Sequence, residues 1–434
     1  MSNINISEKQ RNPWSWIPTV YFAEGLPYIV VMTVSVIMYK RLDISNSEIA
    51  FYTSWLYLPW VIKPFWSPLV ELFKTKRWWI VSMQLLIGAG FAGIAFTLPT
   101  SFFFQGSLAF LWLLAFSSAT HDIAVDGFYM MGLNENQQTF FVGIRNIFYR
   151  LAMITGQGIL VMLAGFLENS ALFATGNNIR LAWAFTFAVI AILFVLLAVY
   201  HKLFLPHPSE DTKQITDSFK SIFANFIETF KAYFLKKDII TILLFLLLYR
   251  LGEAQLVKMA SPFLLDPIDV GGLGLSTNQV GLAYGTIGVI ALMLGGIAGG
   301  WLASRYGFTR LLWWFVLSIN LPNLVYVYLA YAQPSTYWVI AGAVAIEQLG
   351  YGFGFTAYTL YMLYISVGKY KTAHFAFSTG IMALGMMLPG MVSGWIQETI
   401  GYSLFFVWVM ICTIPGFVLA KIIKVDKGFG IRKR

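Results

Sequence analysis

The sequence predicts an all-α integral membrane protein with twelve transmembrane helices in two halves. Three observations lead to this fold class. Of the 434 residues, 58% are hydrophobic and only 11% are charged, whereas soluble domains are about 45–50% apolar and about 25% charged. The apolar residues form runs long enough to cross a bilayer, and the basic residues lie mostly in alternate gaps between those runs. A water-soluble surface could not carry so many apolar side chains without large exposed patches.

A transmembrane helix needs about 20 mostly apolar residues, and twelve such runs can be cut out of the sequence. The first run is too long for the apolar region of a cleaved signal peptide, so we expect it to be retained as a helix. Pro27, Pro59, Pro64 and Pro68 predict bends in the first two helices. The twelve helices are predicted at residues 14–39, 48–70, 78–98, 104–132, 140–167, 181–205, 238–265, 278–303, 310–332, 336–364, 374–397 and 402–424.

The distribution of basic residues predicts the orientation, because cytoplasmic loops are enriched in lysine and arginine. If both termini are cytoplasmic, the inner segments contain 22 of the 29 basic residues, and the outer loops contain only Lys40, Arg41 and Arg180. The other four lie within the predicted helices. We therefore expect both termini to be cytoplasmic.

The longest polar interval, residues 206–237, divides the predicted helices six and six. It predicts an N-terminal half of residues 1–205, a cytoplasmic linker, and a C-terminal half of residues 238–434. Within the linker, phenylalanine and isoleucine recur every three or four residues between positions 219 and 234. This spacing predicts an amphipathic helix on the inner membrane surface. The alternative is a helix that binds a partner protein.

Glycines four residues apart recur in the C-terminal half. They are Gly281 and Gly285, Gly295 and Gly299, and Gly390 and Gly394. Such pairs let helix backbones approach closely within a membrane. They indicate close helix packing but no particular function.

The sequence lacks the features of several function classes. Its basic residues lie in short gaps between apolar runs, so nucleic acid is not expected as a partner. The single cysteine, Cys412, lies in the last run, which leaves no disulfide framework and no CxxC motif. There is no His/Cys cluster and no GxSxG or HExxH string, so we expect neither an enzyme nor a bound cofactor.

Ionisable side chains within the predicted helices are the main guide to function. An ionised group at the bilayer centre costs about 2.5–3.5 kcal/mol or more, so it faces a partner or a wet cavity. Glu24 and Glu347 have no charged neighbour within one helical turn, and we predict that they carry protons. Asp122 and Asp126 share a helix face and repel one another, which also suits a proton carrier. The ten candidates are Glu24, Lys63, His121, Asp122, Asp126, Arg150, Arg250, Glu253, Lys258 and Glu347.

Structural alternatives stand beside these assignments. Asp126 can instead neutralise Lys63 or Arg150, which lie at a similar depth. Arg150 and Arg250 lie in opposite halves and offer the forked geometry that binds a carboxylate or phosphate, which predicts an anionic solute. The alternative is an internal pair between Arg250 and Glu253, one turn away.

The candidate residues form two groups, one for proton coupling and one for solute binding. Aromatic side chains such as Tyr28, Tyr57, Trp60, Tyr351 and Tyr358 can stack on a sugar ring, although most aromatics in such chains serve packing or interfacial belts. A lone buried histidine such as His121 is more often a packing residue than a proton carrier. The predicted proton-coupling residues are Glu24, Glu347, Asp122, Asp126 and Glu253, and the predicted solute-binding residues are Arg150, Arg250, Lys63, Tyr28 and Gln348.

Several strings resemble the AmpG-like muropeptide permeases, a branch of the major facilitator superfamily that is also similar to the acetyl-coenzyme A transporters. Residues 299–307, GGWLASRYG, are similar to the inner-loop GxLxDRxG motif of that superfamily, with Ser304 at the acidic position. The similarity runs in order along nearly the whole chain. Its strings are LPWVIKPFWSPLVE (58–71), SATHDIAVDGFY (118–129), YRLAMITGQG (149–158), YRLGEAQLVKMASPFLL (249–265) and AIEQLGYGFGFTAYTLYM (345–362).

The resemblance implies the superfamily's plan, in which each six-helix half contains an inverted repeat. In that plan helices 1, 4, 7 and 10 line a central cavity, and eight of the ten candidates fall in those helices. It also implies proton-linked import, across a bacterial inner membrane, of N-acetylglucosaminyl anhydro-N-acetylmuramic acid with or without peptide. The chain departs from the family where His121 replaces a usual Gln, Tyr129 a frequent basic residue, and Glu253 a common Asp.

Together these features predict a monomeric, proton-coupled secondary transporter that works by alternating access. Its partners would be a small-molecule solute, a proton and the lipid bilayer. One alternative is a transporter of another sugar derivative, an acyl-coenzyme A-like compound or an amphiphile. Another is a membrane sensor that keeps the fold without transporting, but the inner segments are too short for the soluble signalling domain that such a sensor usually carries.

Overall fold

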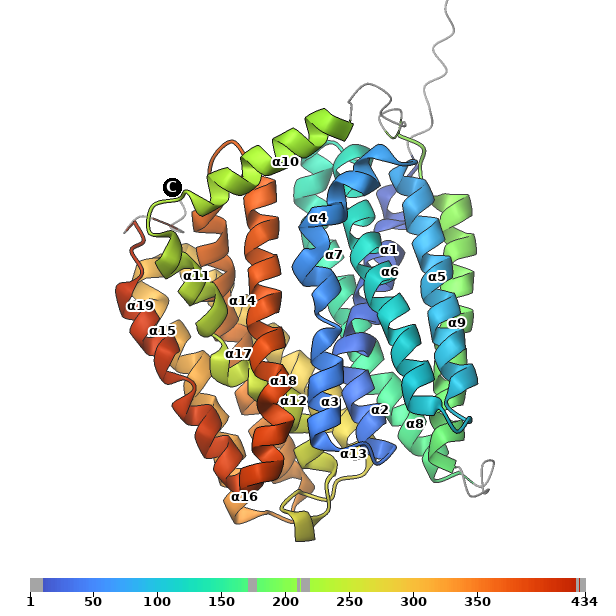
Figure 1. The fold of residues 1–434 in the computed structure, drawn as a ribbon, viewed down its shortest axis with the longest axis vertical. Coiled ribbons are helices and arrows are strands. Elements are labelled where there is room, and N and C mark those ends of the chain that lie inside the picture. The colour runs from blue at the N-terminus through green and yellow to red at the C-terminus, as the bar shows by residue number, and fades with distance from the viewer. Residues whose placement is uncertain (1–10, 171–177, 209–210, 212–218, 427–428, 430–434) are drawn as a thin grey trace, which may run out of the picture.

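The computed structural model describes residues 11–170, 178–208, 211, 219–426 and 429. Within those residues every regular element is helical. Ten helical segments are long and apolar enough to cross a membrane. Figure 1 shows two bundles side by side, one coloured blue to green and the other yellow to red, with α10 lying across one end of both.

The first bundle, called the N-terminal bundle below, extends from η1 to α9. Its helices coincide with the first six predicted runs to within a few residues. The elements are η1 (Pro13–Ser15), α1 (Ile17–Ile29), η2 (Val30–Val34), α2 (Ser35–Arg41), α3 (Asn46–Trp55), α4 (Leu58–Leu72), α5 (Lys76–Thr97), α6 (Phe103–Gly132), α7 (Glu135–Met153), η3 (Ile154–Leu160), α8 (Val161–Glu168) and α9 (Asn178–Phe204).

The second bundle, called the C-terminal bundle, extends from α11 to α19, and α10 (Phe219–Phe234) lies between the two bundles in sequence. Here too the helices coincide with the predicted runs. The elements are α11 (Ile239–Leu248), α12 (Leu251–Leu265), η5 (Ile268–Val270), α13 (Thr277–Val280), η6 (Gly281–Gly288), α14 (Val289–Tyr306), α15 (Phe308–Asn320), η7 (Leu321–Asn323), α16 (Leu324–Ala332), α17 (Tyr337–Ile365), α18 (Lys371–Ile411) and α19 (Ile414–Ile422).

Breaks and bends explain why ten long segments stand where the sequence predicts twelve. The second predicted helix is broken between α3 and α4, and Pro59 lies in the first turn of α4, where its missing N–H would have no helical partner. The last two predicted helices form one continuous segment. That segment bends at Gly401, whose φ of 75° is a conformation that glycine adopts without strain.

Three helices widen into π-helical segments, which hydropathy does not predict. They are η2 after α1, η3 between α7 and α8, and η6 between α13 and α14. Such segments are frequent at functional positions because they turn a helix face relative to a regular α-helix. η3 and η6 pack against each other, and they come from different bundles.

The bundles pack on each other where α3 and α4 cross α18 and where η3 crosses η6. The end opposite α10, where α3 and α13 lie in Figure 1, is called the closed end below. Where α3 crosses α18, a Cβ on Gly394 would lie 2.0 Å from the backbone oxygen of Asn46. Where η3 crosses η6, a Cβ on Gly285 would lie 1.8 Å from the backbone oxygen of Gln157. No side chain fits at either glycine unless the helices move apart. Two of the three predicted glycine pairs therefore pack one bundle on the other.

α10 is the amphipathic helix predicted between residues 219 and 234. Its first five side chains lie outside the described residues. Further along, the ring of Phe226 lies 5.6 Å from that of Phe65 on α4 and 5.8 Å from that of Phe377 on α18, measured between centroids. Phe230 contacts the same two rings. The apolar face of α10 therefore rests partly on the protein's own helices, one from each bundle.

The linker that carries α10 is fixed to both bundles. The two carboxylate oxygens of Asp211 accept the backbone N–H groups of Lys76 and Arg77 at 2.7 and 3.1 Å. An acidic side chain is favourable there because the first N–H groups of α5 have no helical acceptor. At the other end, the buried Tyr233 forms a hydrogen bond of 2.9 Å with Ser378 of α18.

We predict that Gly285→Ala and Gly394→Ala each separate the bundles at the closed end, because the added methyl group meets a backbone carbonyl. Distances between spin labels placed on the two bundles near that end should lengthen, as measured by double electron–electron resonance. Gly300→Ala on α14 is the matched control, because nothing lies within 4 Å of a Cβ at that position. Unaltered distances in both test variants would show that the crossings tolerate a side chain.

Candidate functional site

Acidic and basic side chains meet inside the N-terminal bundle. They are Glu24 of α1, Lys63 of α4 and Asp122 of α6. Lys63 forms an ion pair with Asp122, and Glu24 lies within electrostatic range of the same aspartate. Two carboxyl groups in contact avoid mutual repulsion when they share a proton. The partner that Glu24 needs on another helix is therefore the Lys63–Asp122 pair.

Asp126 lies one turn from this cluster and has a different partner from the two that we considered. It pairs with Arg145 of α7 at 3.4 Å, and 53% of its side chain is exposed. Lys63, one of the two partners expected for Asp126, lies within electrostatic range of it but forms its ion pair with Asp122. Sequence reasoning did not single out Arg145, whose guanidinium also lies 5.2 Å from the ring centroid of Tyr129.

A second acidic group lies inside the C-terminal bundle and is deeply buried. Glu253 of α12 and Glu347 of α17 are 2% and 1% exposed, and each lies within electrostatic range of the other. Gln348 donates to one oxygen of Glu347 at 2.9 Å. The other oxygen, and both oxygens of Glu253, have no hydrogen-bond partner in the described part of the chain. A carboxyl group buried in this way is unfavourable as an anion without a partner.

Arg250 lies between α11 and α12 and is held by aromatic side chains. It donates to the hydroxyl of Tyr351, and its guanidinium lies 4.9 Å from the ring centroid of Phe355. The internal pair with Glu253 is not found, because no salt bridge joins the two among the described residues and both Glu253 oxygens are unpartnered. Glu253 lies within electrostatic range of the guanidinium, but no described carboxylate pairs with it directly, which favours binding of an anion.

The N-terminal bundle also contributes aromatic rings to this region. Tyr28 of α1 and Tyr57, just before α4, lie within electrostatic range of Arg250 across the boundary between the bundles. The Tyr28 ring stands edge-on to that of Trp60, with centroids 5.1 Å apart. Side chains from both bundles therefore converge on the Arg250 guanidinium.

The remaining predicted solute-binding residues have different surroundings. Arg150 donates to the sulfur of Met153 at 3.3 Å and forms no salt bridge among the described residues. It lies within electrostatic range of Tyr351, the residue that also contacts Arg250. Lys63 belongs to the acidic cluster of the N-terminal bundle, and Gln348 contacts Glu347 instead of the arginines.

His121 is fully buried in a hydrogen-bond chain, as expected of a packing residue. Gln84 donates to its Nε2 at 3.0 Å, and the carbonyl oxygen of Gln84 accepts from His201 at 2.8 Å. Tyr358 likewise donates to the backbone oxygen of Leu246 and is fully buried. Tyr358 also lies within electrostatic range of Arg250.

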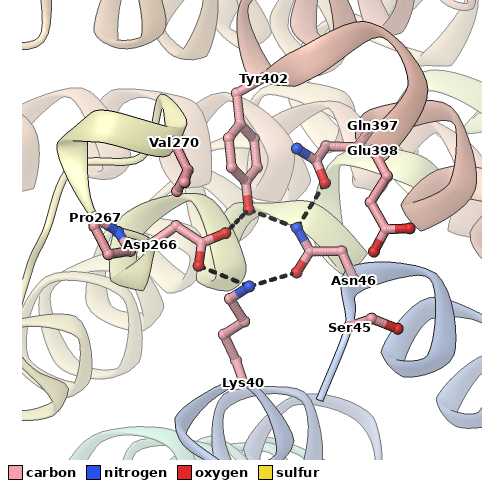
Figure 2. A pocket seen from close by; sticks show the side chains of 9 residues that line it. All are labelled: Lys40, Ser45, Asn46, Asp266, Pro267, Val270, Gln397, Glu398 and Tyr402. Atoms are coloured by element: carbon pink, nitrogen blue, oxygen red, sulfur yellow. Dashed lines mark hydrogen bonds and ion pairs between the residues drawn. The ribbon is translucent and has the colours of Figure 1, made fainter. Parts of the chain in front are cut away.

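A polar network at the closed end was missed by sequence reasoning. Figure 2 shows Lys40 between Asp266 and Asn46. Its ammonium forms an ion pair with Asp266 at 2.7 Å and donates to Asn46 at 2.9 Å. Asn46 in turn donates to Gln397 at 2.6 Å, and the Tyr402 hydroxyl donates to Asp266 at 2.6 Å. The cavity that they line has a volume of about 360 Å³, but these polar groups already bind one another, which suits closure better than ligand binding.

Glu168 forms a second link between the bundles at the closed end. It pairs with Arg41 at 3.0 Å and accepts the hydroxyl of Thr277 on α13 at 2.7 Å. Lys40 and Arg41 are two of only three basic residues that the sequence places in the outer loops. Their rarity on that side was the signal that could have identified both links, because isolated charges near a membrane usually have a partner.

Comparisons with known proteins agree with this architecture. The family model described as Major Facilitator Superfamily matches residues 19–394. The anhydromuropeptide permease of Escherichia coli K12 is 26% identical over 404 residues, covering 92% of this chain and 77% of that protein. AmpG 4 of Rickettsia conorii is 27% identical, and the aligned region covers 91% of this chain and 92% of that protein. A solved D-xylose–proton symporter superposes with a TM-score of 0.71 at 9% identity, over 94% of this chain and 96% of that one. The resemblance expected from the strings is confirmed.

We predict that Lys63→Met destabilises the protein by about 1–3 kcal/mol, because it leaves the Asp122 carboxylate without its counter-ion. The double variant with Asp122→Asn should recover part of this loss, as measured by thermal unfolding of the purified protein in detergent. Lys369→Met, which removes an exposed pair with Glu228, is the control and should leave unfolding unaltered. If the losses of stability caused by Lys63→Met and by Asp122→Asn simply add in the double variant, the ion pair contributes nothing to stability.

Proposed function

The chain belongs to the Major Facilitator Superfamily, and we propose that it imports an anhydro-muropeptide or its disaccharide together with protons by alternating access. It is a transporter and not an enzyme, and it is a multi-pass protein of the bacterial inner membrane. The observation that carries the proposal is that Tyr28 and Tyr57 of the N-terminal bundle lie within electrostatic range of Arg250 of the C-terminal bundle, and that both bundles contain buried acids. Rocking of the bundles would present such a site to either side of the membrane in turn.

The topology that we propose has twelve crossings. In it, α3 and α4 make one broken crossing, and the segment from 371 to 422 makes two, separated by the bend at Gly401. The halves are residues 1–205 and 238–434, joined by a cytoplasmic linker at 206–237. The ratio of 22 basic residues to three supports an orientation with both termini and α10 inside.

In this orientation the closed end faces outward, and the protein is inward-facing. The Lys40–Asp266 pair and the Thr277–Glu168 hydrogen bond hold the bundles together on the outer side. Asp126, nearer to the α10 end, has 53% of its side chain exposed, which supports access for water from the inside. A solute released in this state would leave toward the cytoplasm.

Proton coupling follows from the partners of the acids. When Asp122 binds a proton, Lys63 loses its counter-ion and becomes available to the solute. When Glu347 or Glu253 binds a proton, the cost of a buried, unpartnered charge disappears. Solute and proton then favour the same conformation, which is the condition for coupled transport.

The site also supports an anionic sugar derivative as the solute. Arg150 and Arg250 can hold a carboxylate in a forked arrangement, and the Tyr28 and Trp60 rings offer apolar faces to a sugar. The muramic acid unit of an anhydro-muropeptide carries such a carboxylate. The name of the Escherichia coli relative, anhydromuropeptide permease, agrees with this choice.

The test is uptake of the labelled muropeptide and its peptide-free disaccharide by proteoliposomes, with and without an inward proton gradient. We expect the gradient to drive accumulation by the wild-type protein. Glu24→Gln and Glu347→Gln should lower accumulation to the level seen without a gradient, while exchange of solute across the membrane continues. Accumulation that persists in both variants would remove these residues from the coupling.

The control is Glu228→Gln on α10, an exposed glutamate away from the proposed site, which should accumulate solute normally. No uptake of either compound by folded wild-type protein would reject the solute and leave the transporter assignment intact. Other sugar derivatives and acyl-coenzyme A-like compounds would then be tested in the same vesicles.

A further inference from the structure

Lys258 on α12 is a buried ammonium that the proposed mechanism does not use. Its side chain is 1% exposed, and its Nζ donates to the hydroxyl of Thr53 on α3 at 2.9 Å. It also lies 5.3 Å from the ring centroid of Tyr57. Within the described part of the chain, no carboxylate lies within 4.0 Å of this nitrogen. Burial of a cation without a counter-ion is costly unless another state of the protein provides one.

The contacts of Lys258 cross the boundary between the bundles. Thr53 belongs to the N-terminal bundle, and α12 belongs to the C-terminal bundle. A Cβ on Gly390 of α18 would lie 3.4 Å from the Lys258 side chain and 2.8 Å from the hydroxyl of Ser54. α3, α12 and α18 therefore enclose the ammonium where the two bundles meet, between the central site and the closed end. Movement of α3 away from α18 would open this enclosure.

The hydroxyl groups beside Lys258 differ in what they can offer a ligand. Thr53 already donates its hydrogen to the backbone oxygen of Ile49 at 2.6 Å, so it can only accept from the lysine. The Ser54 hydroxyl is buried and has no partner among the described residues. Gly390 packs against both the Ser54 hydroxyl and the Lys258 side chain, so an ammonium and an uncommitted hydroxyl lie in one region and are two donors that a carboxylate entering there could use. The Tyr57 ring next to them offers an apolar face.

We propose that Lys258 binds the carboxylate of the solute when the closed end is open, with Ser54 as a second donor. This inference rests on the proposed function and adds an anion-binding position on the outer side of the Arg250 centre. When the bundles close, the Thr53 hydroxyl replaces the carboxylate as acceptor for Lys258. The solute is then left to Arg250 and Lys63. Lys258 thereby selects for acidic solutes before they reach the centre.

The first test measures whether Lys258 becomes accessible from outside. Lys258→Cys, in a Cys412→Ser background, is treated in right-side-out vesicles with a membrane-impermeant maleimide. Labelling should be slow, and Gly394→Ala, which opens the closed end, should accelerate it. Ile268→Cys, at an exposed position of η5 near the closed end, is the positive control. No labelling of Lys258→Cys in either background would overturn the proposal.

The second test measures selectivity. Uptake of the disaccharide acid is compared with uptake of its uncharged carboxamide. Lys258→Gln should lower the ratio of kcat/KM for the acid to that for the amide about tenfold, the loss expected for one hydrogen bond to a charged group. Lys258→Arg should restore most of the ratio.

If Lys258→Gln leaves this ratio unaltered, even while it lowers kcat/KM equally for both compounds, Lys258 is only a structural link to Thr53. The labelling test needs no solute, so the two proposals can fail separately. If the wild-type protein transports neither compound, the proposed solute is wrong. If it transports both and the ratio is insensitive to Lys258→Gln, the role of Lys258 is wrong.

Discussion

Contact between bare backbones at Gly285 and Gly394 is the constraint on which the rest of the structure depends. A backbone carbonyl cannot shift its rotamer as a side chain can, so these crossings are either closed or parted, with little between. The ion pair of Lys40 and the hydrogen bond of Thr277 exist only while the crossings are closed. The buried position of Lys258 depends on the same contact. A two-state interface of this kind is what a ligand or proton can bias.

The acids of the two bundles are arranged in different ways. In the N-terminal bundle, Asp122 pairs with Lys63 and Glu24 lies within electrostatic range of both, so a change of protonation redistributes charge within a partnered group. In the C-terminal bundle, Glu253 and Glu347 have no cationic partner within salt-bridge distance among the described residues. There, proton binding converts a buried carboxylate anion into a neutral carboxyl group. In the first arrangement, proton binding frees the Lys63 ammonium to contact an anion. In the second, proton binding removes the free-energy cost of a buried carboxylate anion.

Much of the fold could be predicted from the sequence because helix length and apolarity are local properties. The breaks at Leu56 and at Tyr249, and the π-helical segments, could not, since hydropathy is insensitive to helix register. For the site, the titratable residues were identified because charges in an apolar run are conspicuous. Their partners were not, because pairing is set by tertiary packing: Asn46 and Gln397, for example, are 351 residues apart. The pair of Asp126 with Arg145 was not foreseen for the same reason.

The linker between the bundles has a mechanical consequence. Asp211 fixes it to α5 of the N-terminal bundle, and Tyr233 fixes it to α18 of the C-terminal bundle. Any rotation of one bundle against the other alters the separation of these two anchors, whereas the contour length of the chain between them is constant. The linker is thus a tether whose length limits the travel of the two halves. Its length, as well as its amphipathic pattern, is then part of how far the protein can open.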